Sequence, residues 1–194
     1  MQLQRAIYNR RSCRSFKAKK PDWRDILDVL DTTRAAPMAG GYFTLNFLIV
    51  NDEEKIKEIA EWAEQPFIAE AKYLVAFISD PSIIKNIYGD RAEMYATQQA
   101  GAAIQNFMLA LTEKKLSTCW VGHFNDEKVK KVLEIPGSKK LEAIFPIGYE
   151  KIKPITRKVQ ADLYNRVNWN RWGNKRMNAP RTVDVPYEDK HSKY

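Results

Sequence analysis

The sequence has few of the residues that bind metals or form disulfides. Its 194 residues include two cysteines, Cys13 and Cys119, which lie far apart along the chain, and two histidines, His123 and His191. A structural zinc site needs about four such ligands, usually at close spacing. This pattern argues against a metal site, and it favours two reduced thiols over a disulfide in a reducing compartment.

The chain also lacks a long hydrophobic run. The longest apolar stretch covers residues 73–78, whereas a membrane-spanning helix needs roughly 20 apolar residues. The N-terminus, MQLQRAIYNRR, has no apolar stretch of the kind found in signal peptides. We therefore expect a cytoplasmic protein that does not insert into a membrane.

Several catalytic and nucleotide-binding motifs are absent. The sequence contains no GxGxxG fingerprint and no GxxxxGK[ST] loop, which excludes the usual dinucleotide and Walker sites. No paired carboxylates, GxSxG motif or Ser/His/Asp order indicates hydrolysis. If the chain is an enzyme, a cofactor is expected to carry the chemistry.

Positive charge is abundant but unevenly placed. The net charge is +8; residues 1–24 carry eight Lys and Arg against one acid, and residues 151–194 carry eleven against four. Residues 25–150 carry thirteen against nineteen. The two basic ends could meet around one anion or could face nucleic acid, and a solvated surface accounts for the same pattern.

Hydrophobic periodicity predicts one domain in which helices and strands are mixed. Helices are expected over about 2–9, 21–34, 52–63, 91–113 and 126–134, and strands over 46–50, 73–79, 118–122 and 141–149. This order fits both α/β and α+β classes, and spacing alone does not decide between them. From Glu150 onward the chain is aperiodic but rich in aromatic residues, so we expect that segment to cover a surface of its own chain or of a partner.

Three short segments are candidates for binding. Arg10, Arg11, Ser12 and Arg14 place three guanidinium groups and a hydroxyl within five residues, which suits a phosphate. A solvated basic turn is the alternative interpretation.

The second segment contains Pro37, Met38, Gly40 and Gly41, whose glycines let a ring or phosphate approach the backbone, as an ordinary turn also does. The third ends a predicted strand at Val121, Gly122 and His123, where backbone N–H groups become available to a ligand. His123 is either a proton donor or incidental to the loop.

Five segments, in order along the chain, resemble the nitroreductase family. They are RRSCRSF at 10–16, ATQQAGAAIQNFMLALTEKKLSTCWVG at 96–122, LEAIFPIGY at 141–149, PITRK at 154–158 and NWNRWG at 168–173. The resemblance implies an α+β, nitroreductase-like fold with a central, mainly antiparallel sheet flanked by helices. It also implies a core over residues 1–150 and a C-terminal extension, 151–194, exchanged in a homodimer.

The same resemblance implies FMN bound noncovalently at the dimer interface. Arg10, Ser12 and Arg14 match the positions that hold the phosphate and ribityl chain, with Arg11 beside them, and Arg157 matches a second basic residue at the phosphate. The backbone of Val121, Gly122 and His123 matches the loop that borders the flavin ring. The loop that contains Pro37, Met38, Gly40 and Gly41 matches a family loop whose side chains contact FMN.

This resemblance further implies an FMN-dependent oxidoreductase that needs no catalytic side chain. Hydride would pass from NADH or NADPH through the flavin to a nitroaromatic or quinone acceptor by a ping-pong cycle. A flavin-binding protein of the same fold, with another reaction such as reductive dehalogenation or no reductase turnover, is the alternative. A nucleic-acid-binding domain is disfavoured, and the expected partners are a second copy of the chain and a small acceptor.

The sequence departs from the family in the glycine loop. Where the family usually has APSAGNxQPW, this chain has APMAGGYFTL, so Met38, Gly41 and Phe43 replace Ser, Asn and Gln. These replacements remove side-chain hydrogen bonds to FMN. We therefore expect the substrate side of the ring to be more apolar than usual.

Overall fold

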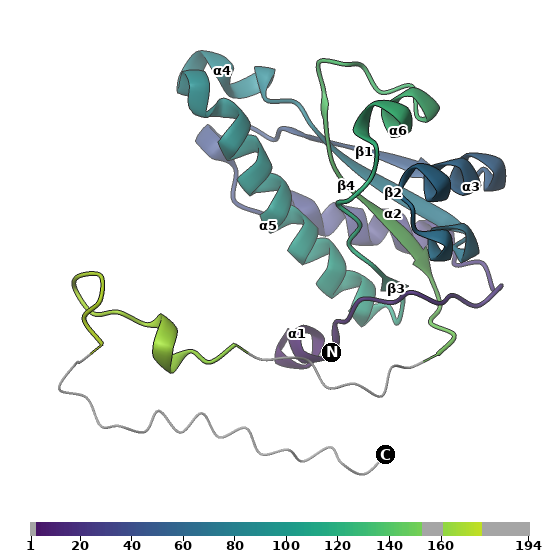
Figure 1. The fold of residues 1–194 in the computed structure, drawn as a ribbon, viewed down its shortest axis with the longest axis horizontal. Helices are drawn as coiled ribbons and strands as arrows, with labels where there is room; N and C mark the ends of the chain where they lie inside the picture. Colours follow the sequence, from purple (N-terminus) through teal and green to yellow (C-terminus); the bar gives the residue numbers. More distant parts are fainter. Residues whose placement is uncertain (1–2, 153–160, 176–194) are drawn as a thin grey trace, which may run out of the picture. The chain divides into compact units, whose positions relative to one another are not determined.

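The computed structural model describes residues 3–152 and 161–175. The chain divides into two compact units, residues 1–153 and 154–194, and each is described by itself. The first unit contains the sheet and the main helices (Figure 1). None of the helices described is long and apolar enough to cross a membrane.

A four-stranded antiparallel sheet forms the centre of the first unit, in the order β1-β2-β4-β3. The strands are β1 (Leu45–Val50), β2 (Tyr73–Ser79), β3 (Ser117–Thr118) and β4 (Lys140–Gly148). Every residue of β2 is buried, because the strand lies inside the sheet with a layer of helices on each face. Val75 and Phe77 face one layer, and Leu74 and Ala76 face the other, as the two-residue period of a strand requires.

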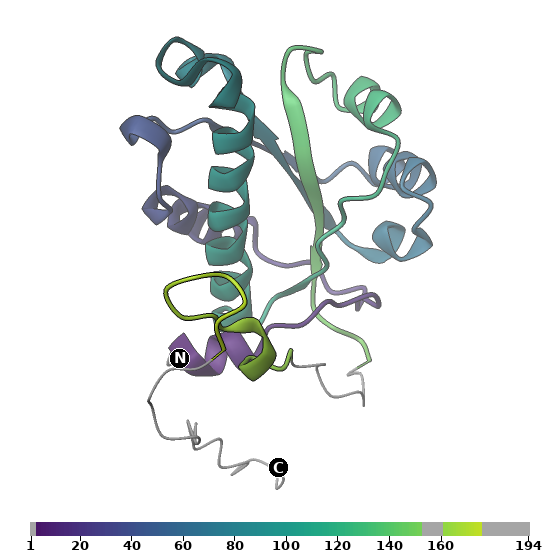
Figure 2. The same cartoon turned by 60° about the vertical axis from the view of Figure 1, so that its left-hand side comes forward.

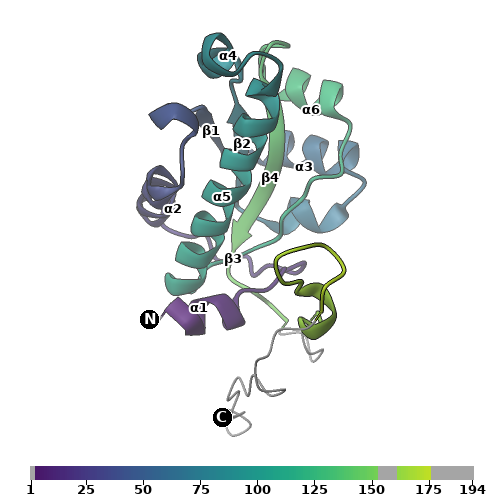
Figure 3. The ribbon, with the colours of Figure 1, turned by 90° about the vertical axis from the view of Figure 1, so that its left-hand side faces the viewer.

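Helices cover both faces of this sheet (Figure 3). They are α1 (Leu3–Asn9), α2 (Trp23–Asp31), α3 (Glu53–Trp62), α4 (Ser82–Tyr88), α5 (Ala92–Glu113) and α6 (Asp126–Val132). The buried faces of α2 and α5 pack on the sheet around Phe77, Phe107 and Phe145, whose ring centroids lie 5.1–5.5 Å apart. The opposite face packs against α3 and α6.

The longest helix, α5, runs along the sheet with α4 near its first turns and α1 near its last (Figures 1 and 2). Its buried positions recur every three or four residues, as predicted, and several of them are alanine. These small side chains allow the helix to approach the sheet closely. At about 1.5 Å of rise per residue, the 22 residues of α5 separate its two ends by roughly 33 Å.

Two predicted elements end well before their expected last residues. The helix predicted to reach residue 34 stops at Asp31 and continues as a 3-10 turn, Thr32–Ala35, where the hydroxyls of Thr32 and Thr33 bond back to backbone carbonyls. The strand predicted over 118–122 pairs regularly only over Ser117–Thr118. Its ladder resumes at Val121, which exchanges two backbone hydrogen bonds with Ile144. Pro146 lies opposite the interruption and has no N–H to donate.

Helix α4 was not predicted from the sequence. This helix is short, and it is followed by Gly89, whose φ is +52°. It is tied down at its start by Asp80, which accepts hydrogen bonds from Ser82 and forms an ion pair with Lys139. Pro81 before it and Gly89 after it were the available signals.

The second unit is described over residues 161–175. It contains a 3-10 turn, Tyr164–Arg166, and a tight turn in which the N–H of Trp169 donates to the carbonyl of Asn174 at 2.8 Å. Large apolar side chains of this segment, including Tyr164 and Trp172, are exposed within the chain. The segment therefore orders its own backbone without burying these side chains.

Candidate functional site

The N-terminal arginine segment is held against the sheet by its backbone. The N–H of Cys13 donates to the carbonyl of Thr118 at 2.9 Å, and the N–H of Lys17 donates to Tyr149 at 2.8 Å. Ser12 pairs with Thr118, and Phe16 pairs with Glu150. Side chains of such an extended segment point alternately to its two sides.

Arg10, Ser12 and Arg14 lie on one side, around the thiol of Cys119. Burial raises the pKa of this thiol above its usual value, and Arg14, Ser12 and Arg10 each act in the opposite direction. Ser12 and Arg14 are exposed. Within residues 3–152 and 161–175, neither Arg10 nor Arg14 has a carboxylate partner. These three side chains therefore form a cationic cluster with hydrogen-bonding capacity for an anion.

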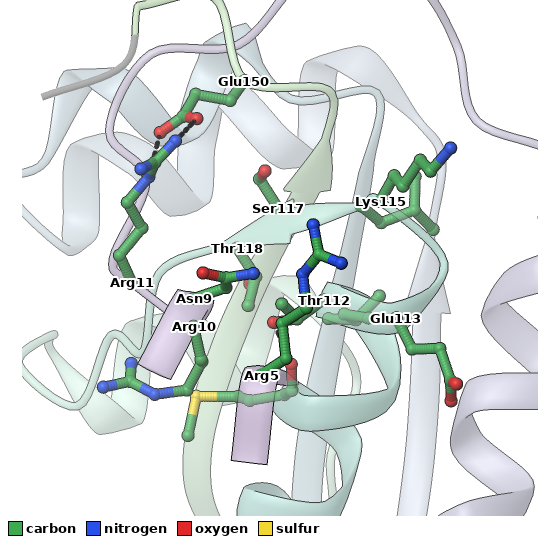
Figure 4. Close-up of a pocket in the computed structure, with 13 residues that line it drawn as sticks. Arg5, Asn9, Arg10, Arg11, Thr112, Glu113, Lys115, Ser117, Thr118 and Glu150 are labelled. Carbon is green, nitrogen blue, oxygen red and sulfur yellow. Dashed lines mark hydrogen bonds and ion pairs between the residues drawn. The ribbon is translucent and has the colours of Figure 1, made fainter. Parts of the chain in front are cut away.

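Arg11 points to the other side. Its guanidinium group donates two hydrogen bonds to the carboxylate of Glu150, one of them Nε to Oε1 at 2.9 Å. These bonds raise the pKa of Arg11, and burial partly offsets that rise. Arg10 and Arg11 leave the backbone in different directions (Figure 4). The charge of Arg11 is thus largely neutralised inside the protein.

A cavity of about 730 Å³ lies between α1, the last turns of α5 and the start of β3 (Figure 4). Arg5, Arg10 and Lys115 supply positive charge to its lining, and Glu150 faces it already paired with Arg11. Thr118 also lines it, and the buried hydroxyl of Thr118 has no hydrogen-bond partner among residues 3–152 and 161–175. The cavity therefore adjoins the cationic cluster through Arg10.

The loop after β3 begins at Cys119, whose thiol interacts with the same cluster. The N–H of Val121 is used by Ile144 at 3.1 Å, whereas the N–H groups of Gly122 and His123 have no hydrogen-bond acceptor in the part of the chain that the structure describes. The loop is fixed from behind, because Gln65 donates to the carbonyl of His123 and Asn125 donates to that of Trp62. The side chain of His123 is exposed.

The glycine loop contains a 3-10 turn, Ala39–Gly41. Gly40 and Gly41 have φ values of +60° and +79°, a region that favours glycine. A Cβ at Gly40 would lie 3.2 Å from the hydroxyl of Tyr88. Further along, the N–H and hydroxyl of Thr44 both donate to the side-chain carbonyl of Gln99, which anchors the loop to α5.

The structure does not bring this loop to the arginine segment within one copy of the chain. Ala39 packs with Ala96 near the start of α5, whereas the cavity beside Arg10 is lined by Thr112 near its end. Sixteen residues of helix separate Ala96 from Thr112, about 24 Å along the axis. The first predicted segment therefore pairs with Thr118, on the strand that leads to the third, and the second is remote from it.

Arg157, predicted to be a second phosphate ligand, lies outside the described residues. Glu150, the partner of Arg11, was missed, because its position gives no sign of a contact 139 residues away. Within residues 3–152 and 161–175, no group of three or more His, Cys, Asp or Glu is arranged to hold a metal ion.

Comparisons with known proteins agree with one another. The model of the nitroreductase family matches residues 7–70 and 59–149. A putative NADH dehydrogenase/NAD(P)H nitroreductase of Archaeoglobus fulgidus is 27% identical over 150 residues, covering 75% of this chain and 83% of that protein. An iodotyrosine deiodinase of Thermotoga neapolitana is 24% identical over 156 residues, covering 72% and 84%.

Solved structures share the fold at low identity. Nitroreductase A of Vibrio parahaemolyticus has a TM-score of 0.79 at 21% identity, covering 90% of this chain and 78% of that one. The NADPH:FMN oxidoreductase of Vibrio harveyi, in complex with NAD+, has a TM-score of 0.77 at 20% identity, covering 88% and 77%.

Proposed function

The chain belongs to the nitroreductase family, and from this premise we propose that it is an FMN-dependent oxidoreductase that uses NADH or NADPH. The proposed electron acceptor is a small planar molecule of the nitroaromatic or quinone type, reduced in a ping-pong cycle. The observation that carries the proposal is the cationic cluster of Arg10, Ser12 and Arg14 around Cys119, on the segment that continues to the Gly122 and His123 amides.

FMN fits these residues. A terminal phosphate needs cationic and hydroxyl donors, and Arg10, Arg14 and Ser12 offer them without a competing carboxylate in the described residues. Gly122 and His123 offer backbone donors at the edge of the sheet, where a flat ring can lie against the loop. When bound, FMN supplies the hydride chemistry, and the protein supplies orientation and charge.

No side chain is assigned a catalytic role. Transfer of hydride between nicotinamide and flavin moves no proton that the protein must carry, and a quinone can collect protons from water. The exposed His123 therefore contributes through its backbone. Arg11 supports the site through Glu150, and its removal should weaken phosphate binding less than removal of the other proposed arginine ligands. The family resemblance is the basis for proposing Arg157 as a further phosphate ligand.

The glycine loop supports a site shared between two copies of the chain. Pro37, Met38, Gly40 and Gly41 are proposed to contact flavin, yet α5 separates this loop from Arg10 and Arg14 in one copy. A homodimer that brings the loop of one copy to the arginine segment of the other resolves this separation. The exposed aromatic side chains of residues 161–175 also need a surface to cover them, and exchange of the C-terminal extension would provide it.

Identification of the bound flavin tests the proposal most directly. The purified protein should be yellow, should release FMN and not FAD on denaturation, and should oxidise NADH or NADPH with para-benzoquinone as acceptor. Light scattering should give the mass of a dimer. A colourless protein that takes up no FMN, or a flavin-loaded protein without turnover on any quinone or nitroaromatic, would contradict the proposed function.

Similarity to an iodotyrosine deiodinase favours one second candidate, a reductive dehalogenase that uses the same FMN site. Release of iodide from an iodophenol under dithionite, in the absence of quinone turnover, would favour that reaction.

A further inference from the structure

A second cluster, which we call the tyrosine–arginine cluster, lies where the glycine loop meets the start of α5. It consists of Tyr88, Arg91 and Tyr95. The rings of Tyr88 and Tyr95 pack edge to face with centroids 4.9 Å apart. Both rings pack against a small buried cluster that also contacts Ala39 of the glycine loop. The two tyrosines and the loop are therefore parts of one surface.

Arg91 gives this surface a positive charge. Its guanidinium group donates to the hydroxyl of Tyr95 at 3.4 Å, and this bond raises the pKa of Arg91. Arg91 is exposed, and no carboxylate of residues 3–152 or 161–175 lies within ion-pair distance of it.

Two lysines at this end of the sheet are already paired. Lys139 forms an ion pair with Asp80, and Lys140 forms one with Glu93 at 3.3 Å. The charge of Arg91 is therefore available to a ligand, whereas the charges of Lys139 and Lys140 are paired with carboxylates.

We propose that the tyrosine–arginine cluster selects the electron acceptor, and that the preferred acceptor is a planar ring bearing a carboxylate or sulfonate group. This inference rests on the proposed function, in which the glycine loop beside the cluster contacts the flavin ring bound by a second copy of the chain. A guanidinium group binds such an anion through two parallel hydrogen bonds. Tyr95 is a positioning residue that holds Arg91, and the tyrosine rings give a flat acceptor an aromatic surface.

The surroundings of the cluster support this class of ligand. Tyr42, Ile87 and Met94 are exposed apolar side chains on the loop, α4 and α5. Tyr42 lies against the same loop, because a Cβ at Gly40 would be 3.5 Å from its ring. An apolar surface with one cation suits a ring with one anionic substituent. The net charge of +8 also draws anionic molecules to the protein.

Two acceptors of nearly equal shape separate charge from fit. Reduction of para-nitrobenzoate and of para-nitrotoluene is measured at saturating NADH, with the wild-type holoenzyme and with Arg91→Gln. We expect the wild type to prefer para-nitrobenzoate, and Arg91→Gln to lower kcat/KM for that acceptor about ten- to a hundredfold, as loss of a charge-assisted hydrogen bond implies. The change should appear in KM, since ground-state and transition-state binding are lost together. Tyr95→Phe should act in the same direction and more weakly.

Lys85→Gln is the matched control, because it removes one exposed cation from the neighbouring α4 and should leave the ratio of the two acceptors unchanged. Binding without turnover is measured by calorimetry with para-hydroxybenzoate and para-cresol. Arg91→Gln should weaken only the former.

Three results would overturn the inference. They are an equal loss for both acceptors, an equal effect of Lys85→Gln, and a rise in KM that is confined to NADH, which would assign Arg91 to the reductant. Turnover of neutral para-benzoquinone separates this inference from the proposed function. If that turnover is present without charge discrimination, only the inference fails, and if the protein holds no FMN, both fail.

Discussion

Arg11 and Glu150 form a two-pronged ion pair that joins the N-terminal segment to the residue after β4, across 139 positions of sequence. The side chain of Glu150 is 10% exposed, and that of Arg11 is 37% exposed. The pair fixes the backbone between Arg10 and Arg14 and so determines which side chains remain available to an anion.

Removal of Arg11 should reduce stability more than cofactor binding. Arg11→Met leaves a buried carboxylate unpaired, and the free energy of unfolding should fall by about 1–2 kcal/mol, at the low end for charged hydrogen bonds because water screens Arg11. Thermal melts should show a decrease of roughly 2–8 °C. The double variant Arg11→Met, Glu150→Gln should recover part of that loss. Equal stability of wild type and Arg11→Met would contradict this account.

Removal of Arg14 should reduce cofactor binding more than stability. Arg14→Ala is expected to weaken FMN binding by roughly 1.5–3 kcal/mol, which is about ten- to a hundredfold in Kd, with little change in melting temperature of the apoprotein. Quenching of FMN fluorescence on titration with apoprotein measures the affinity. Arg11→Met serves as the control with the smaller effect. If Arg11→Met weakened FMN binding more than Arg14→Ala, the placement of Arg14 on the side of the segment that binds the phosphate, and of Arg11 on the other side, would be wrong.

Gly148 should be intolerant of any side chain. A Cβ at this position would lie 2.9 Å from the ring of Phe16, so the arginine segment would have to move. Gly148→Ala should lower the free energy of unfolding by about 1–3 kcal/mol and reduce FMN affinity as well. Gly137→Ala, where a Cβ meets nothing within 4 Å, is the matched control. Equal melting temperatures for these two variants would refute the prediction.

Stability should depend on the ionisation of Asp80. Hydrogen bonds from Lys139 and Ser82 hold the pKa of its carboxyl group below the usual range. Its contribution is therefore present above the unfolded-state pKa of about 4 and is lost as pH falls through the lower folded-state value. Melts of wild type and Asp80→Asn should differ at pH 7 and converge below about pH 4. Asp31→Asn, at an exposed ion pair, should show little difference at either pH.

His123 should be dispensable for hydride transfer. His123→Ala keeps the backbone donor next to Gly122, so the variant should retain FMN and be reduced by NADH or NADPH less than about tenfold more slowly, under about 1.4 kcal/mol in barrier. Stopped-flow bleaching of flavin absorbance measures this step. A loss of a hundredfold with FMN still bound would make His123 a catalytic residue.

The hydrophobic pattern was sufficient for the elements that contribute most to the core. The buried positions of α5 and the continuous apolar run of β2 were both predicted, and the nitroreductase-like fold with its mainly antiparallel sheet is confirmed. The short helix α4 was missed because seven residues contain too few turns to establish a period. The break before Val121 depends on Pro146 in a different strand, which no local pattern reveals.

The candidate site could be predicted only as separate segments. The RRSCRSF motif indicated an anion site, but the alternation that separates Arg11 from Arg10 and Arg14 depends on an extended backbone and on Glu150. The cluster around Tyr88 and Arg91 could not be foreseen, because it forms where the unexpected α4 meets the glycine loop.

The length of α5 has a consequence for mixtures of damaged chains. Under the proposed dimer, each site takes its arginines from one copy and its glycine loop from the other, because 16 residues of α5 separate Ala96 from Thr112. In a homodimer of chains that carry Arg14→Ala, or of chains with a disrupted loop, both sites are defective. In a heterodimer of the two, both defects fall on the same site and the other site is intact. Two such alleles would therefore complement each other in one cell, with up to one working site per heterodimer.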